Sequence, residues 1–200
     1  IMRNFPQQLA AGVTTVRDMG AFPVLLHKHL AMLNSGKLAG PRVVFCNAFT
    51  NIKGSHPDIR PSDAGALAGL AISFTGNPNL WFESDRDLIE KMEANTAGGA
   101  SFIKLTMDDT SLMCGKDAIP FYSGSHWKII KDFAQQRRLP LAGHVNTRFG
   151  FNRALTHGID SLEHIADINI SDGDIEQMSK RKIAIIPTLT VAQMLAAEEA

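Results

Sequence analysis

Short apolar runs alternate along this chain with longer segments in which apolar residues recur at helical spacing. Residues 13–16 form a β-branched run between Gly12 and Asp18, and residues 42–45 form a second run after Pro41. Both runs have the length and composition of buried strands. Four later runs repeat the pattern and are separated by helix-like segments: residues 102–106, 141–145, 160–164 and 183–186. Strands that alternate with helices predict right-handed β–α–β units and a parallel sheet, either a barrel or an open doubly wound sheet.

Capping residues and helix breakers mark the segments between these runs. Ser84 and Ser171 each precede a segment with helical spacing, so we expect both to cap helices. Gly98 and Pro140 stand where two of these segments stop. The predicted helices cover residues 22–34, 84–97, 125–138, 151–157 and 172–182.

One stretch shows no such regularity. Residues 46–82 contain glycine and proline throughout, and these residues interrupt both helices and strands. The stretch predicts a long irregular loop inserted in a single domain of residues 1–200. Long loops in compact domains are commonly functional or disordered.

Three polar residues stand at the ends of three predicted strands: Lys104, His144 and His164. In a parallel β/α barrel the carboxyl ends of the strands meet at one mouth, so these side chains would converge there. No G-x-G-x-x-G motif follows the first strand, which argues against a dinucleotide-binding open sheet. Alternation along each strand would place the residue two positions earlier in the lumen as well: Phe102, Ala142 and Leu162.

A lysine in a barrel lumen needs a physical reason, because a buried ammonium group loses its hydration. Lys104 could form a salt bridge with Asp108 or Asp109. It could instead be an imine-forming nucleophile, or its amine could be carboxylated by carbon dioxide into an oxygen ligand for a metal. The two histidines favour carboxylation, since imidazole and carboxylate suit zinc and similar divalent ions.

Composition narrows the classes of function. The 200 residues are 44% apolar and carry 20 basic against 20 acidic residues, which suits one globular core and indicates neither a nucleic-acid nor a membrane partner. No apolar run approaches the roughly 18 residues of a membrane span. Cys46 and Cys114 form no disulfide framework and no zinc motif, which favours a reducing, cytoplasmic location. An export signal could still lie upstream of Ile1.

Several motifs, in this order, resemble the amidohydrolase superfamily, nearest to its imidazolonepropionase-like enzymes and the related prolidases and dipeptidases. The resemblance runs from the family's second strand to its seventh, where Ile186-Pro187-Thr188-Leu189 matches the usual strand ending. The earlier motifs are Gly12-Val13-Thr14-Thr15-Val16-Arg17-Asp18, Gly40-Pro41-Arg42-Val43, Ile103-Lys104-Leu105, Gly143-His144 and Gly158-Ile159-Asp160-Ser161-Leu162-Glu163-His164.

The resemblance implies a (β/α)8 TIM barrel of the metal-dependent hydrolase type, incomplete here with about six β/α units. Such a barrel holds one or two divalent metals, with Zn²⁺ the first expectation. By position, Lys104 would be the carboxylated bridging lysine of strand four, His144 the ligand of strand five and His164 the ligand of strand six.

Two parts of the family's metal centre lie outside these residues. The first strand of the family carries a His-x-His pair, and its eighth carries an aspartate that acts as general base. His27 and His29 show the pair's spacing but fall within a predicted helix. We therefore expect a fragment of a larger enzyme whose catalytic base lies elsewhere. Asn146 also stands where many relatives have a second histidine after strand five.

The activity implied is hydrolysis of a C–N bond in an amide, a cyclic amide or an aminoacyl or dipeptide compound by a metal-activated water. Candidates for binding a small amide or peptide-like substrate are Tyr122, Arg148 and, more weakly, His56. A homo-oligomer is compatible with the sequence. Two alternatives stay open, namely a class I aldolase-like barrel with Lys104 as Schiff-base lysine, and a non-catalytic relative that binds a ligand or partner.

Overall fold

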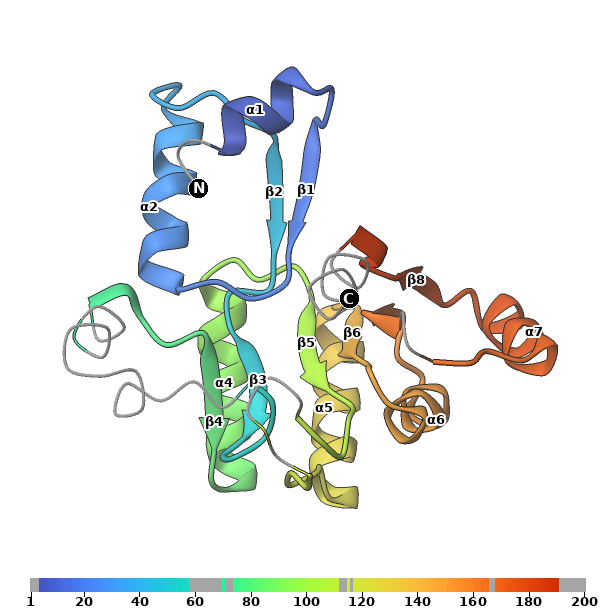
Figure 1. Cartoon of the computed structure of the whole chain (residues 1–200). Helices are drawn as coiled ribbons and strands as arrows, with labels where there is room; N and C mark the ends of the chain where they lie inside the picture. Colours follow the sequence, from blue (N-terminus) through green and yellow to red (C-terminus); the bar gives the residue numbers. More distant parts are fainter. Residues whose placement is uncertain are drawn as a thin grey trace.

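The structure of the chain, a computed structural model, describes residues 4–57, 70, 74–111, 115, 117–165 and 168–190. The described strands pair in parallel and form three sheets (Figure 1). Their ladders do not join into a closed barrel within these residues. The first sheet holds β1 (Thr15–Asp18) and β2 (Arg42–Phe45), and the second holds β3 (Phe49–Ile52) and β4 (Asn79–Phe82). The third has the order β5 (Ile103–Thr106), β6 (Leu141–His144), β7 (Ser161–Glu163) and β8 (Ala184–Ile186).

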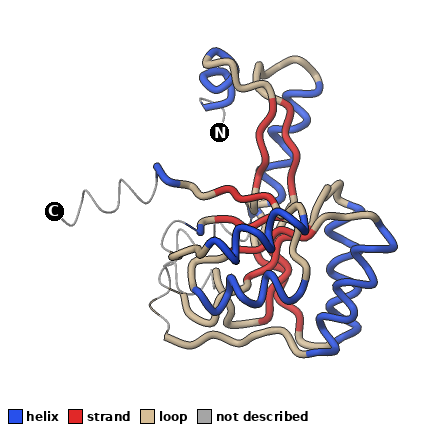
Figure 2. Tube along the Cα trace, turned by 90° about the vertical axis from the view of Figure 1, so that its right-hand side faces the viewer, coloured by secondary structure: helices blue, strands red, loops and turns tan. Residues whose placement is uncertain are grey.

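Helices lie on the outside of the strands, as Figure 2 shows. None of the described helices has both the length and the apolar character that crossing a membrane requires. They are α1 (Asn4–Ala10), α2 (Pro23–Asn34), α4 (Asp85–Ala97), α5 (Gly124–Arg137), α6 (Arg148–His157) and α7 (Asp172–Arg181).

The predicted caps are confirmed. The Ser84 hydroxyl accepts a hydrogen bond from the Asp87 backbone N–H at the start of α4, and the Ser171 hydroxyl accepts one from Asp174 at the start of α7. Helix α6 begins earlier than predicted because the Thr147 hydroxyl caps it by accepting from the Gly150 N–H. These local hydrogen bonds fix where each helix begins.

The core has two parts, one on each side of the strands. Ile103, Leu105 and Ile130 belong to the larger cluster, which lies between the third sheet and its helices. A smaller cluster on the opposite side contains Cys46, Phe102 and Ala142, with Met19 and Val44 packed against it. The inward placement predicted for Phe102 and Ala142 is therefore confirmed.

The inward placement predicted for Leu162 is wrong. Leu162 is buried in the helix-side cluster, and its neighbours Ser161 and Glu163 point the other way, toward Arg17. Strand β7 ends at Glu163, and His164 has a left-handed backbone with φ of 74°. Alternation along the strand therefore stops before His164. The direction of the His164 side chain thus does not determine the direction of Leu162, two residues earlier.

The long irregular loop predicted for residues 46–82 needs correction at both ends, where β3 and β4 form a parallel pair. Asn47 has φ of 62° and bends the chain between β2 and β3. The Asn95 side-chain amide holds this bend by donating to the carbonyls of Cys46 and Ala48, at 2.7 and 3.0 Å. The chain before this bend thus forms β2 of the first sheet, and the chain after it forms β3 of the second. Residues 58–69 and 71–73 of the predicted loop lie outside the described residues, as does Cys114.

Candidate functional site

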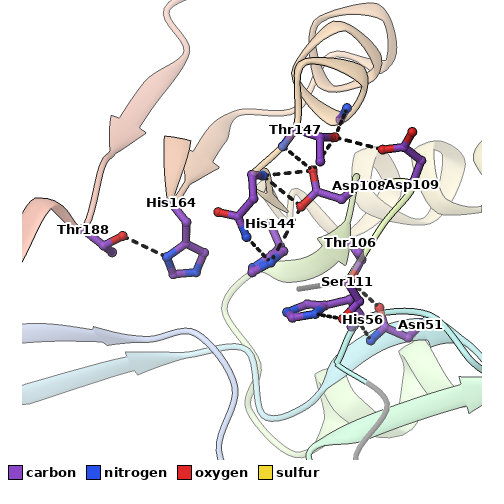
Figure 3. Close-up of polar contacts among 12 residues, drawn as sticks. Asn51, His56, Thr106, Asp108, Asp109, Ser111, His144, Thr147, His164 and Thr188 are labelled. Carbon is purple, nitrogen blue, oxygen red and sulfur yellow. Dashed lines mark hydrogen bonds and ion pairs between the residues drawn. The ribbon is translucent and has the colours of Figure 1, made fainter. Parts of the chain in front are cut away.

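The strand ends bring the two predicted histidine ligands together. The ring centroids of His144 and His164 are 4.8 Å apart, with 61° between the ring planes (Figure 3). In the ladder between β5 and β6, His144 pairs with Thr106 and Lys104 pairs with Ala142. Lys104 therefore lies two residues deeper along the sheet, below the pair of rings.

Lys104 is completely buried, and its Nζ has no hydrogen-bond partner within the described residues. Burial lowers the pKa of Lys104 to about 7, and the negative charge of Glu163 offsets this only in part. A salt bridge with Asp108 or Asp109, one of the alternatives left open for Lys104, does not form. Asp108 instead accepts hydrogen bonds from the backbone beyond β6, and Asp109 lies 3.0 Å from the Thr147 hydroxyl.

His144 is a buried, neutral imidazole. Burial holds its pKa well below the ordinary value, and the charges of His56, Lys104 and His164 act in the same direction. Its Nε2 lies 2.9 Å from the Asn146 side-chain amide and 3.8 Å from Asp108 Oδ2. A neutral imidazole is the form that binds a metal ion.

His56 comes to the site from the segment after β3. Its ring stacks on that of His144, with centroids 4.1 Å apart and 21° between the planes. His56 Nδ1 lies 2.7 Å from the Ser111 hydroxyl, and its backbone carbonyl accepts hydrogen bonds from Asn51 and Thr106. Burial lowers the pKa of His56 to about 4. The structure thus places a third neutral imidazole beside the predicted pair.

His164 is held by Thr188, whose hydroxyl lies 3.1 Å from His164 Nδ1 (Figure 3). Burial lowers the pKa of His164, and the charge of Lys104 adds to the effect. Sequence reasoning did not assign Thr188 a role, although it stands in the strand-ending motif after β8.

Asp108 is a buried carboxylate that fixes the turn after β6. Its oxygens accept from the backbone N–H groups of Asn146 at 2.9 Å and Thr147 at 3.0 Å. Burial raises the pKa of Asp108 to about 6 in spite of these hydrogen bonds. Gly150 is required here, because a Cβ at that position would lie 2.2 Å from Asp108 Oδ1. The position of Asp108, two residues beyond the end of β5, was the signal that could have identified this role.

Comparison with known proteins places this geometry in context. No family model matches the chain. Ochratoxinase from Aspergillus niger is 24% identical over 207 residues, which cover 98% of this chain and 42% of that protein. Its crystal structure aligns with a TM-score of 0.75 at 22% identity, over 98% of this chain and 47% of that one.

Two further solved structures are similar. A prolidase complexed with N-methylphosphonate-L-proline gives a TM-score of 0.72 at 21% identity, over 94% of this chain and 45% of that one. An amidohydrolase gives 0.72 at 19% identity, over 99% and 48%. These neighbours are consistent with the amidohydrolase superfamily. The resemblance stated from the sequence is confirmed at this level. The chain spans about half the length of the proteins it matches.

Two of the predicted substrate-binding residues make their contacts with other parts of the chain. Tyr122 is buried, and its hydroxyl donates to the Thr50 carbonyl at 2.6 Å while accepting from the Thr106 N–H at 3.3 Å. Arg148 pairs with Asp174 of α7 at 2.9 Å. Both side chains are engaged in internal contacts, so their placement gives no support to a role in substrate binding.

The side chains at this site fit a divalent metal, of the kind that amidohydrolases use, in one respect but not in another. Within the described ranges, no group of three or more His, Cys, Asp or Glu side chains is placed to hold a metal ion. The amine of Lys104, however, is buried without a hydrogen-bond partner among the described residues. Carboxylation would convert this amine into an oxygen donor to accompany the neutral imidazoles.

Proposed function

We propose that the chain is part of a metal-dependent hydrolase that cleaves a C–N bond in an amide, cyclic amide, aminoacyl or dipeptide substrate. Residues 1–200 would form an incomplete part of a (β/α)8 barrel, with Lys104, His144 and His164 holding one or two divalent ions, Zn²⁺ in the first instance. The carrying observation is Lys104, a fully buried amine without a hydrogen-bond partner among the described residues. The similarity to ochratoxinase and a prolidase supports the class of bond.

A divalent ion, when bound, supplies Lewis acidity that polarises a carbonyl group and acidifies a water molecule. The residues of this chain orient the donors. Asp108 and Asn146 fix the end of β6, from which His144 projects, and Thr188 orients the ring of His164. These contacts hold the two rings 4.8 Å apart, as residues that orient metal ligands do.

His56 is the candidate for contact with substrate. Its Nδ1 is engaged by Ser111 at 2.7 Å, which leaves Nε2 as the ring nitrogen available to a substrate oxygen. Stacking on His144 holds the His56 ring against the candidate centre. A hydrogen bond from His56 would orient a substrate carbonyl there, whereas the general base is expected outside these residues.

The test is elemental analysis of the full-length protein, its Lys104→Ala variant and a matched Lys180→Ala variant. Lys180 pairs with Glu176 on the surface of α7 and lies far from the candidate ligands in sequence. Divalent metal should be present in the wild type and in Lys180→Ala and lost from Lys104→Ala. Metal content that is the same in all three proteins would contradict the carboxylated-lysine centre. Hydrolysis of N-acyl amino acids and X-Pro dipeptides, assayed with the same proteins, tests the activity.

The second candidate function is catalysis through an imine formed on Lys104. Burial lowers the pKa of Lys104 to about 7, and an amine that is uncharged near neutral pH is nucleophilic. Borohydride trapping of a carbonyl substrate on Lys104 would favour it, and a tightly bound metal would argue against it. A protein that shows neither metal nor an adduct would fit the non-catalytic relative.

A further inference from the structure

A partly buried ion pair links two strands that are not neighbours in any of the described sheets. Arg17 of β1 contacts the Glu163 carboxylate of β7 at 3.0 Å and donates to the Ser161 hydroxyl at 3.0 Å. Strand β1 pairs with β2, whereas β7 lies between β6 and β8. The Arg17 guanidinium also lies 4.4 Å from the ring centroid of Phe102, on β5. One side chain therefore connects three strands on the side of the sheet that faces Lys104.

Glu163 is held firmly by this network. Its side chain is only 2% exposed, and the same carboxylate oxygen accepts from Arg17 and, at 2.8 Å, from the Ser161 hydroxyl. A buried carboxylate that lost Arg17 would be left without a compensating charge nearby, apart from the deeper Lys104. Arg17 and Glu163 both belong to the motifs that resemble the amidohydrolases, yet the proposed metal centre uses neither of them directly.

The residue after Glu163 is the candidate ligand His164. His164 has φ of 74°, a backbone conformation that is unfavourable for a non-glycine residue and persists only where the surroundings enforce it. The backbone on each side is anchored, because the Glu163 carbonyl accepts from Val145 and the His164 N–H donates to Ile186. The Glu163 side chain, which Arg17 contacts at 3.0 Å, adds a further contact next to this peptide, on the side of the sheet toward which Lys104 points.

We propose that Arg17 is a positioning residue for His164 and acts through Glu163. The guanidinium clamps the Glu163 side chain and so maintains the left-handed turn that directs the His164 ring toward His144. This inference deepens the proposed function, since His164 is a candidate ligand there, and it can be tested without a metal.

The first experiment records histidine-ring ¹H–¹⁵N spectra of the metal-free full-length protein, with His164 assigned from a His164→Gln variant. Arg17→Met should shift the His164 ring signals and leave those of His126, on α5, in place. Arg137→Met is the matched control, because Arg137 pairs with Glu93 at the surface, and it should shift neither. Arg17→Lys retains the charge but not the two-pronged contact, so an intermediate shift is expected.

A second variant covers the case in which Arg17→Met does not fold. Arg17→Met combined with Glu163→Gln removes the unpaired buried charge and should fold, while the His164 signals stay displaced. Metal affinity, measured by Zn²⁺ competition titration, should fall about 10-fold in the variants that displace His164, as for other residues that orient ligands.

The outcomes separate this inference from the proposed function. Unchanged His164 ring signals in the folded double variant would overturn the positioning role even if the protein binds metal. A wild type that binds no metal, but whose His164 signals move in the Arg17 variants, would sink the metal centre and support the positioning role.

Discussion

Strands β5 and β6 differ sharply in burial from β1 and β8. Every residue of β5 and β6 is buried, whereas β1 alternates between exposed and half-buried positions and β8 is largely exposed. Lys104 and His144 are therefore fixed by packing on both faces of their strands. His164 stands beside β8 and depends on single polar contacts, with Thr188 and through the Glu163 clamp. The two halves of the candidate site should respond differently to mutation.

The largest effect is expected at Lys104, at the centre of the buried half. Lys104→Met replaces the buried amine with an apolar side chain of similar length. The substitution should stabilise the metal-free protein by a few kcal/mol at pH 6, since each unit of pKa shift is about 1.4 kcal/mol. The pKa of Lys104 is lowered from 10.5 to about 7, so the unfolded chain holds more protons between these values. Wild-type stability should rise with pH through this window, and the advantage of the variant should shrink.

Urea denaturation at pH 6 and pH 9 measures this difference. Lys180→Met, at an exposed lysine of α7, is the control and should show no such dependence on pH. Equal gains for Lys104→Met at both pH values would show that the amine is not shielded from water as its burial indicates.

The next largest difference is expected when a large side chain is removed from the buried region and from the exposed region. Ile130→Ala on α5 deletes a fully buried side chain and should lower the free energy of unfolding by about 3 kcal/mol. Ile175→Ala on α7 deletes one that is 54% exposed and should change it by less than about 0.5 kcal/mol. Urea denaturation of both variants measures the difference. Similar losses in the free energy of unfolding would contradict the contrast in burial between the two regions.

Helix caps provide a smaller difference. Ser171→Ala removes the α7 cap and should cost about 1 kcal/mol. Thr147→Ala removes the α6 cap and also the hydroxyl contacts with Asp108 and Asp109, so about 2 kcal/mol is expected. Thermal unfolding of both variants tests the order. A greater loss for Ser171→Ala would show that the Asp108 contacts add nothing.

Thr188 should show only a small effect on stability but a local effect on one half of the site. Thr188→Val removes one hydroxyl at nearly constant shape and should cost less than about 1 kcal/mol. The His164 ring signals should nevertheless shift, while those of His144 stay close to their positions. Thr156→Val is the control, because the Thr156 hydroxyl bonds only within α6. Movement of both rings together would show that the two halves of the site are not independent.

The sequence predicted the features that local chemistry determines. Serine caps and helix breakers indicated α4 and α7, and short runs between helix-like segments indicated the strands of the third sheet. It failed where distant contacts decide the structure. Strand β3 exists because Asn95, on another element, holds the bend at Asn47. Glu163 faces inward, opposite to the buried Leu162, and contacts Arg17, which lies 146 residues away in the sequence.

The predictions for the candidate site also divide into those based on local sequence and those that depend on distant contacts. Strand ends and a family resemblance selected Lys104, His144 and His164; the structure brings the two histidine rings together, and the role of all three as metal ligands stays a prediction. The substrate-binding prediction placed Tyr122 on the loop after strand four and Arg148 just after strand five, where its charge could pair with a carboxylate, but neither position determines the direction of the side chain. Tyr122 turns toward Thr50, and Arg148 turns toward α7. His56, the weakest candidate, lies against His144 through stacking and the Ser111 contact, neither of which follows from spacing.

Gly150 has a practical consequence for any attempt to evolve this protein. It lies on α6 and touches no candidate ligand, so a library aimed at the site would treat it as a free position. Any side chain there would collide with Asp108, whose oxygens organise the turn that carries Asn146 and Thr147. Randomised libraries should keep codon 150 fixed, and deep mutational scanning should find it as intolerant as the buried strands.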